Sequence, residues 1–409
     1  MATAATTDLK DPGLYEAGVP WDTFRELRRE DPVHWNPEAD GSGFWAVMRH
    51  ADIVEVSRQP LLFSSAHENG GHRIFNENEV GLTGAGESAI GIPFISRDPP
   101  VHTRYRKFIM PALSPVRLGD IETRIRERVA RLVAEIPLDE PINLVPALSA
   151  PLPLMTLAEL LGVSIDLWPK LYDWTNAFVG EDDPEFRQSP EAMAETLGEF
   201  FAFGQELFDA RRAQPTSDIS SLLANAEIDG EPVPFRDFIG NLILVLVGGN
   251  ETTRNSLSHS VAAFSANPDQ WAQIREDRDV LKTAAPEMVR WASPVMHMRR
   301  TATADTTVGG HAVRKGDKVV LWYISANRDE TVFEDADTFN VRRKGPLHVG
   351  FGAGQHVCVG SRLAEMQLRI AFDMLADRVK SFEVHAPPRR FRSNFINGLK
   401  NLDVTLRPA

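Results

Sequence analysis

Apolar residues recur every three or four positions along several long stretches of this chain, and charged residues lie between them. This period places the apolar side chains on one face of a helix. It predicts helices over residues 114–136, 151–161, 191–212, 235–264 and 358–379.

Two shorter apolar runs indicate strands instead. Residues 44–47 follow the turn cluster Asp40-Gly41-Ser42-Gly43, and residues 318–324 follow a turn at 314–317. Residues 68–91 carry several Gly and Asn residues and few periodic apolar positions, which predicts a long surface loop of the kind that covers binding sites. The expected fold class is therefore mainly α with a small β-sheet region.

Composition and charge narrow the classes of function. The 409 residues include 44 Lys and Arg against 57 Asp and Glu, a net charge of −13, which argues against a nucleic-acid binder. The longest nearly apolar run, 238–249, is well short of the roughly 20 residues that a membrane-spanning helix needs. Residues 1–13 show no targeting pattern. We therefore expect a cytoplasmic protein without a membrane anchor.

The single cysteine, Cys358, excludes an internal disulfide and any metal site built only from thiols. It lies in the segment 351–360, FGAGQHVCVG, where glycines let the backbone turn tightly and approach a flat ligand. A helix is predicted to begin directly after it, so that free backbone N–H groups and the helix dipole favour the thiolate. Three interpretations stay open: a buried structural cysteine, a nucleophile with His356 as its base, and an iron ligand.

A pair of glycines interrupts the long helix predicted over 235–264. Gly248 and Gly249 cost about 1 kcal/mol each relative to alanine inside a helix. Their missing side chains open space for a small ligand such as dioxygen, beside Glu251 and a Thr252 hydroxyl that can bond back to the Gly248 carbonyl. The alternative is that the glycines allow close helix packing and that Glu251 forms a solvated pair with Arg254.

The residues around Cys358 match the pattern Phe-x-x-Gly-x-His-x-Cys-x-Gly, which resembles the haem-binding loop of the cytochrome P450 family. The stretch 248–253 is similar to the oxygen-activation motif of that family, an acid followed by an alcohol. Glu287-Met288-Val289-Arg290 resembles its structural Glu-x-x-Arg pair. The resemblance implies a bacterial P450 fold in a single large domain over residues 1–409, in which residues 1–20 form a flexible N-terminal segment.

The resemblance also implies haem b as cofactor, with Cys358 as the ligand of its iron. Two haem carboxylates would be costly to bury without paired donors, and several cations match the family's propionate contacts. The residues assigned to the cofactor are His102, Arg106, Gly248, Arg300, Phe351, His356, Cys358 and Gly360. Glu251 and Thr252 are assigned to catalysis, Thr252 by holding iron-bound dioxygen and Glu251 by delivering protons.

The implied activity is a monooxygenase that inserts one oxygen atom from O2 into a hydrophobic small molecule, such as a terpenoid, a sterol side chain or an alkyl chain. The expected substrate pocket comprises Leu244, Val247, Val295, His297, Met298, Phe395 and Ile396. His297 is the candidate for orienting a polar group of the substrate.

No reductase is fused to the chain, so electrons are expected from a separate ferredoxin. The protein itself is expected to be a monomer. The proposed docking cations are Arg104, Arg342, Arg343, Lys344 and Arg362. Two other classes stay open: a haem-thiolate gas or redox sensor that does not oxygenate, and a hydrolase that uses Cys358 as nucleophile.

Overall fold

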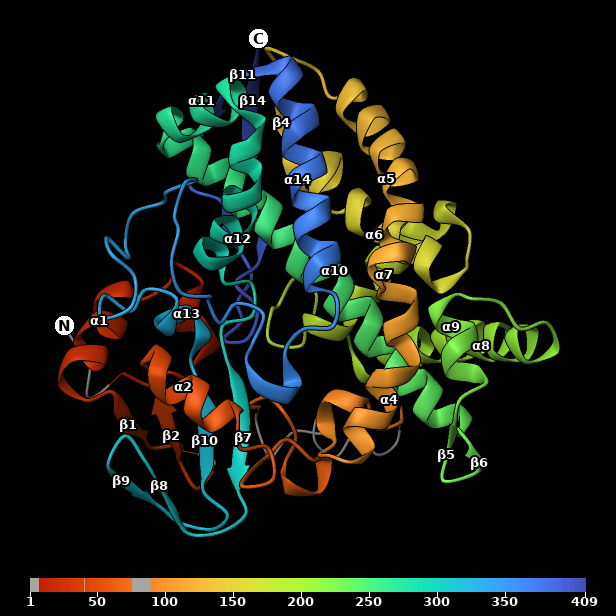
Figure 1. Cartoon of the computed structure of the whole chain (residues 1–409), viewed down its shortest axis with the longest axis vertical. Coiled ribbons are helices and arrows are strands. Elements are labelled where there is room, and N and C mark those ends of the chain that lie inside the picture. Colours follow the sequence, from red (N-terminus) through yellow and green to blue (C-terminus); the bar gives the residue numbers. More distant parts are fainter. Residues whose placement is uncertain (1–6, 40, 76–89) are drawn as a thin grey trace.

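A long central helix organises the fold of the computed structural model, which describes residues 7–39, 41–75 and 90–409 (Figure 1). This helix, α10, spans Phe235–Ala266. The helices described around it are α1 (Trp21–Glu30), α2 (His50–Ser57), α4 (Val101–Ile109), α5 (Pro115–Glu135), α6 (Pro151–Leu161), α7 (Trp168–Val179), α8 (Pro190–Ala213), α9 (Ile219–Ala224), α11 (Pro268–Glu276), α12 (Leu281–Ala292), α13 (Tyr323–Ala326) and α14 (Ser361–Arg378).

The helices predicted over 114–136, 151–161, 191–212 and 235–264 are confirmed to within two residues at each end. The helix predicted from 358 begins later, at Ser361, and ends at Arg378. Cys358 therefore lies in the turn that precedes α14, three residues before its first helical residue.

A five-stranded sheet in the order β1-β2-β10-β7-β3 lies beside the helices. Its strands are β1 (Val33–Asn36), β2 (Phe44–Val47), β10 (Lys318–Leu321), β7 (Met298–Ala302) and β3 (Phe63–Ser64). Strand β10 pairs parallel to β2 and antiparallel to β7, so the sheet joins segments from both halves of the chain.

The strand predicted over 318–324 is wrong for its last three residues, because it ends at Leu321 and α13 begins at Tyr323. The Trp322 carbonyl accepts hydrogen bonds from the N–H groups of Ser325 and Ala326, which turns the backbone into a helix. All of these side chains are buried. The sequence pattern of a short apolar run does not distinguish a buried strand from a buried helix.

Smaller sheets lie near the C-terminus. Strands β11 (Val379–Val384), β14 (Asp403–Pro408) and β4 (Pro141–Asn143) form one sheet, and β12 (Arg389–Arg390) pairs with β13 (Leu399–Asn401). We call residues 389–401 the C-terminal hairpin. Two further pairs, β5 (Glu227–Ile228) with β6 (Glu231–Pro232) and β8 (Thr306–Val308) with β9 (His311–Val313), lie in loops.

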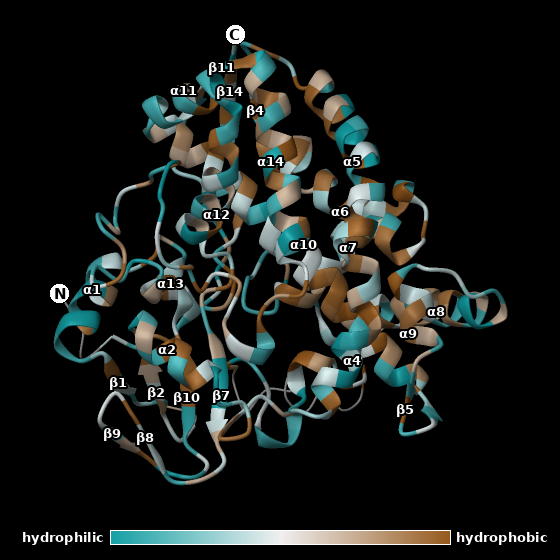
Figure 2. Ribbon diagram, viewed as in Figure 1, coloured by the Kyte–Doolittle hydropathy of each residue, from teal (hydrophilic) through white to brown (hydrophobic). Residues whose placement is uncertain are grey.

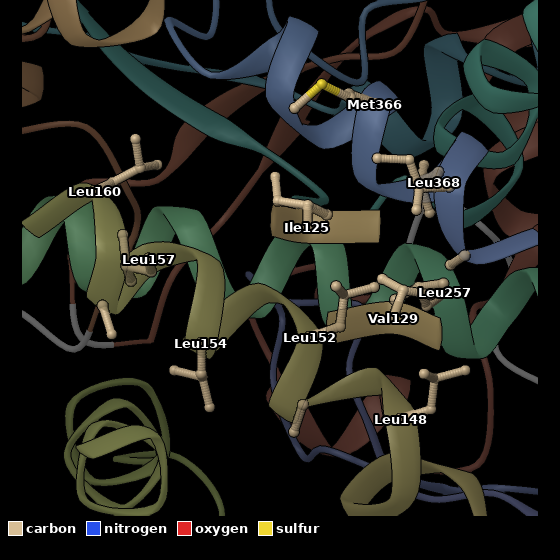
Figure 3. Close-up of a cluster of buried hydrophobic side chains, with 14 of the residues drawn as sticks. Ile125, Val129, Leu148, Leu152, Leu154, Leu157, Leu160, Leu257, Met366 and Leu368 are labelled. Carbon is tan, nitrogen blue, oxygen red and sulfur yellow. The ribbon is translucent and has the colours of Figure 1, made fainter. Parts of the chain in front are cut away.

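The main hydrophobic core lies where α5, α6 and α14 pack against or near α10. Figure 3 shows Ile125 and Val129 of α5, residues of α6 including Leu157, Leu257 of α10 and Leu368 of α14 within one cluster. Figure 2 shows hydrophobic residues gathered on α6, while the outer turns of α5 alternate between hydrophilic and hydrophobic. This core fixes α10 and the start of α14 relative to each other, which matters because both contribute to the site below.

The expectation of a flexible segment over residues 1–20 needs correction at residues 9–15, while its first six residues lie outside the described residues. Leu9 and Tyr15 are buried, the Tyr15 hydroxyl donates to the Leu9 carbonyl at 2.9 Å, and the Tyr15 ring stacks on Trp322. Residues 9–15 are therefore part of a second core cluster and do not form a flexible segment. Among the described residues, the helices are all too short or too polar to cross a membrane.

Most of the predicted loop at 68–91, namely residues 76–89, lies outside the described residues. Both flanks of that part are held firmly. The N–H of Ile74 donates to His297 Nε2, and the N–H of Phe94 donates to Asn241 Oδ1 of α10 at 2.8 Å. A Cβ on Gly240 would lie 2.2 Å from the Gly91 carbonyl oxygen, so only glycine allows this close approach to α10.

Candidate haem and oxygen site

The loop before α14 directs the Cys358 thiol into a cavity. The backbone N–H of Cys358 donates to the Phe351 carbonyl at 2.8 Å, and this hydrogen bond closes the loop. Gly352 and Gly354 have φ angles of 73° and 66°, in the left-handed region that favours glycine. A Cβ on Gly354 would lie 2.1 Å from the Ser57 carbonyl oxygen of α2, so this glycine is also required by packing.

The electrostatic environment of the Cys358 thiol differs from the sequence expectation. Its surface is exposed to the cavity but surrounded by protein, and this burial raises the pKa of the thiol. The Gly360 N–H and the Arg106 charge lower that pKa without reversing the shift. The helix terminus therefore does not by itself stabilise a thiolate, whereas coordination to a metal ion deprotonates a thiol outright.

The cavity collects most of the predicted site residues from distant parts of the chain. It has a volume of about 240 Å³, measured as the space open to the centres of water molecules. The predicted residues that line it are His102, Arg106, Leu244, Gly248, Thr252, Val295, Met298, Arg300, Phe351, His356, Cys358 and Gly360. Apolar side chains that the sequence did not single out complete the wall, among them Phe94, Ile95, Ile109, Leu113, Val245 and Leu363.

Four cationic or imidazole side chains meet at one edge of the cavity. The rings of His102 and His356 lie 4.1 Å apart, and Arg106 and Arg300 line the same space. Burial lowers the pKa of His102 to about 4, with help from Arg106 and Arg300. Burial also lowers the pKa of His356 well below its usual range, so both imidazoles are neutral at pH 7.

Two buried nitrogens of this group, His102 Nδ1 and His356 Nε2, have no hydrogen-bond partner within the described parts of the chain. Buried polar atoms are normally satisfied, so a ligand with matching acceptors is expected here. Two carboxylates beside two arginines and two imidazole N–H groups form such a match. The residues present therefore fit a haem, whose propionates these four side chains would hold and whose iron Cys358 would bind.

The two glycines of α10 have different surroundings. A Cβ on Gly248 would meet nothing within 4 Å, whereas a Cβ on Gly249 would lie 3.2 Å from Leu157 Cδ1 of α6. Both glycines line the cavity, but only Gly248 leaves open space there, whereas Gly249 packs closely on Leu157. The Thr252 hydroxyl donates to the Gly248 carbonyl at 2.8 Å, as the sequence predicted.

Glu251 does not line the cavity. Its side chain is fully buried behind α10, forms an ion pair with Arg254 and accepts a hydrogen bond from Asn250 at 3.0 Å. Burial raises the pKa of Glu251, and Arg254 opposes that shift. The alternative of a solvated ion pair between Glu251 and Arg254 is therefore wrong, because the side chains of both residues are fully buried.

Several residues expected in the substrate pocket lie behind its wall. Val247, His297, Phe395 and Ile396 are not among the residues that line the cavity. His297 Nδ1 donates to the Asn394 carbonyl at 3.1 Å while Nε2 accepts from Ile74, and burial lowers its pKa to about 3. Both ring nitrogens are used, so His297 joins backbone segments and is not placed to orient a substrate. Ile396 forms a β-bridge to the lining residue Val295.

Comparison with known proteins identifies the architecture. The family model described as cytochrome P450 matches residues 156–406. A linalool 8-monooxygenase of Pseudomonas putida is 70% identical over 98% of this chain and 99% of its own. The chain belongs to the cytochrome P450 family. The predicted fold, the haem b cofactor and the monooxygenase class are thereby confirmed.

The chain is also similar to more distant members of the family. A steroid C26-monooxygenase of Rhodococcus jostii is 36% identical over 98% of this chain and 85% of its own. A cytochrome P450 of Mycobacterium marinum, solved in complex with pseudoionone, has a TM-score of 0.90 at 32% identity, with 98% of each chain covered.

The Glu-x-x-Arg pair of this P450 is a fully buried brace. Arg290 Nε and Nη2 donate to the two oxygens of Glu287 at 2.6 and 2.8 Å, and Arg290 Nη1 donates to the carbonyls of Asn327 and Ala336. Arg343 Nε adds a third donor to Glu287 at 3.0 Å. Arg343 has a side chain that is only 12% exposed, which corrects its assignment as a docking cation of the surface.

The other predicted docking cations remain on the surface of the P450. Lys344 and Arg362 are exposed, and within the described residues neither forms an ion pair. Arg342 is half exposed and donates to Gln273 at 2.7 Å. Arg104 pairs with Asp229 at 2.5 Å.

Proposed function

We propose that this P450 hydroxylates an acyclic terpenoid alcohol of the linalool type, with Cys358 as the ligand of the haem iron. The observation that carries the assignment is the exposed thiol in a largely apolar cavity whose one polar edge has unpaired buried donors. The substrate class is supported by the 70% identity to the linalool 8-monooxygenase. An apolar wall suits a hydrocarbon chain, which gains about 25 cal/mol for each Å² removed from water.

Each side of the cavity has a distinct task. His102, Arg106, Arg300 and His356 would hold the propionates, while Phe351 and Gly360 flank the thiol in the loop. When bound, haem supplies the iron chemistry that activates dioxygen. One oxygen atom enters the substrate and the other leaves as water, with two electrons and two protons taken up in each turnover.

The protein controls the protons of this reaction through α10. Because the Thr252 hydroxyl donates its own proton to the Gly248 carbonyl, its lone pairs remain available on the cavity side. Thr252 can thus accept a hydrogen bond from a protic ligand and hold it in place. The carboxyl group of Glu251, one residue earlier, would relay protons to a ligand held by Thr252.

Electrons are proposed to arrive from a ferredoxin that docks near the start of α14. Arg362 lies in the first turn of α14, close in sequence to Cys358, and Lys344 is exposed on the segment that leads into the loop. Leu347 on that segment is 86% exposed and offers an apolar contact beside the cations. Arg342 and Arg104 complete the proposed surface, from which the structure removes Arg343.

Two measurements test the assignment. The ferrous carbon monoxide form should show the long-wavelength band of thiolate ligation, and Cys358→Ala should lose it. Linalool and related acyclic alcohols should shift the iron spin state and yield a hydroxylated product with two electrons consumed for each molecule. Stronger binding and turnover of steroids or of long alkanes than of any acyclic terpenoid would contradict the substrate class.

Docking is tested by the rate at which ferredoxin reduces the protein. Replacing Lys344, Arg362 and Arg342 by glutamine should slow reduction and flatten its dependence on salt. Lys282→Gln, which removes an exposed cation from α12, is the matched control. Equal rates in the triple variant and the wild type at low salt would refute the docking surface.

A further inference from the structure

The C-terminal hairpin forms a second layer behind one wall of the cavity. Its tip, residues 393–397, lies along residues 294–298, which we call the wall segment. The two are joined by two backbone hydrogen bonds of 2.8 and 2.9 Å and by the β-bridge between Val295 and Ile396. The wall segment lines the cavity with Pro294, Val295 and Met298. The position of the hairpin tip therefore fixes the position of this part of the wall.

Residues 8–15, which we call the N-terminal strut, form a third layer behind the hairpin. Asn394 Nδ2 donates to the Lys10 carbonyl at 2.5 Å, and Arg390 Nε donates to the Tyr15 carbonyl at 3.2 Å. Both acceptors are backbone carbonyls. The hairpin is therefore held by the path of the strut backbone at these two points, and not by the strut's side chains.

The strut is itself fixed to the five-stranded sheet. The Leu9 N–H donates to Asn36 Oδ1 of β1 at 2.9 Å, and Asn36 Nδ2 donates to Asp8 Oδ1 at 3.0 Å. The Tyr15 hydroxyl donates back to the Leu9 carbonyl, and the Tyr15 ring stacks on Trp322. A terminal segment is ordered when it is tied down in this way. The strut thus connects the sheet rigidly to the hairpin tip.

Asn394 joins the strut to the wall segment directly. Its side chain donates to Lys10, while its backbone carbonyl accepts a hydrogen bond from His297 Nδ1 at 3.1 Å. Asn394 is buried. Packed interiors transmit displacements because they contain few voids. A shift of the strut is therefore passed through one residue to the wall.

We propose that the N-terminal strut positions the cavity wall, and that Asn394 is the positioning residue through which it selects the carbon atom that is oxidised. The proposal rests on the proposed function, since an acyclic terpenoid alcohol offers several methyl and methylene groups along one flexible chain. The depth at which that chain lies against the wall decides which group is presented for reaction. A misplacement of about 1 Å can change a rate by about 100-fold, so a wall held from behind by two layers favours one position over its neighbours.

Amide hydrogen exchange of the holoenzyme tests the mechanical part. Asn394→Ala removes the donor to Lys10 without altering the wall segment itself. Exchange in peptides that cover 294–298 should become about tenfold faster, the scale of one lost buried hydrogen bond. Trp271→Phe is the matched control, because it removes a buried side-chain donor to the Val379 carbonyl, and it should leave exchange at 294–298 unchanged.

The products of linalool oxidation test the selection of the carbon atom. In Asn394→Ala the ratio of minor to main hydroxylated isomers should rise about threefold, because the wall is no longer held at one depth. Asn394→Asp has the same size but a carboxylate that cannot donate to Lys10, so the ratio should shift in the same direction. Trp271→Phe should keep the wild-type ratio. The ratio does not depend on the amount of folded protein, so a merely structural role would not change it.

A milder variant covers the case in which neither Asn394 variant folds. Tyr15→Phe removes only the hydroxyl that donates to the Leu9 carbonyl, and it should speed exchange at 294–298 about threefold and shift the isomer ratio in the same direction.

Wild-type exchange at 294–298 in both Asn394 variants, or in Tyr15→Phe where those two do not fold, overturns the proposal. A wild-type isomer ratio in a variant with faster exchange also overturns it, because the wall would then loosen without moving the substrate. If no acyclic terpenoid alcohol is hydroxylated, the proposed function fails, while exchange still decides whether the strut holds the wall.

Discussion

Replacing Gly248 by alanine should stabilise α10 and narrow the cavity in the same step. Alanine is favoured over glycine inside a helix by about 1 kcal/mol. The added Cβ meets nothing within 4 Å, so no packing penalty offsets that gain. The free energy of unfolding is therefore expected to rise by about 1 kcal/mol. The same methyl group projects into the cavity, where overpacking against a bound ligand costs about 1–3 kcal/mol.

Gly249→Ala provides the matched comparison. It gains the same helix propensity, but its Cβ lies 3.2 Å from Leu157 Cδ1, so α6 must give way slightly. Its stability should change little, and substrate affinity should fall less than in Gly248→Ala, because this methyl meets Leu157 of the cavity wall and not open space. Urea unfolding measures the first effect, and titration of the spin-state shift with linalool measures the second. If Gly248→Ala lowers stability, or if both variants weaken linalool binding equally, the assignment of the two glycine faces is wrong.

Three further outcomes follow from the geometry. Arg343→Met should lower the free energy of unfolding by about 1–3 kcal/mol, since it removes a buried donor from Glu287, while Arg342→Gln should change it by less than about 0.5 kcal/mol; equal effects in urea unfolding would contradict the buried brace. His297 has a pKa of about 3 in the fold against 6.5 in the unfolded chain, so the unfolded state binds the extra proton and stability falls as pH drops from 6.5 toward 3. His297→Gln should remove about 1.4 kcal/mol for each pH unit of that slope, measured by urea unfolding between pH 6 and pH 4, and an unchanged slope would show that His297 is not held neutral. Asn241→Leu leaves the Phe94 N–H without its acceptor and should cost about 1–3 kcal/mol and weaken linalool binding, because Phe94 lines the cavity; the control Asn267→Leu loses only a bond to its own helix end and should leave binding unchanged.

The parts of the fold that the sequence predicted are those determined locally. Long amphipathic helices such as α5 and α10 have many periodic positions, so their bounds follow from the pattern alone. The loop at Cys358 is also local, because its glycine conformations and its closing hydrogen bond lie within a few residues. The turn from β10 into α13 was missed because burial hides the difference between a strand and a helix.

The misassigned site residues depend on contacts between distant segments. Whether His297 faces the substrate or joins Ile74 to Asn394 is decided by residues far away on both sides. Arg343 follows Arg342 in a basic run, yet only the position of Glu287 makes it a buried donor. The hydrogen bond from the Phe94 N–H to Asn241 holds Phe94 in the cavity wall. The sequence near Phe94 carries no signal for this bond.

The parallel pairing of β10 with β2 also constrains when this protein can acquire its cofactor during synthesis. A ribosome adds about 5–20 residues per second. Strand β2 is therefore made long before its partner β10 and stays unpaired with it while most of the chain is synthesised. The loop at Cys358 emerges later still, and the cavity wall needs α4, α10 and α14 together. Haem capture is therefore a late event. A chain that still lacks these elements would leave the apolar wall exposed, and haem, as a ligand of the folded cavity, would stabilise the folded state by mass action.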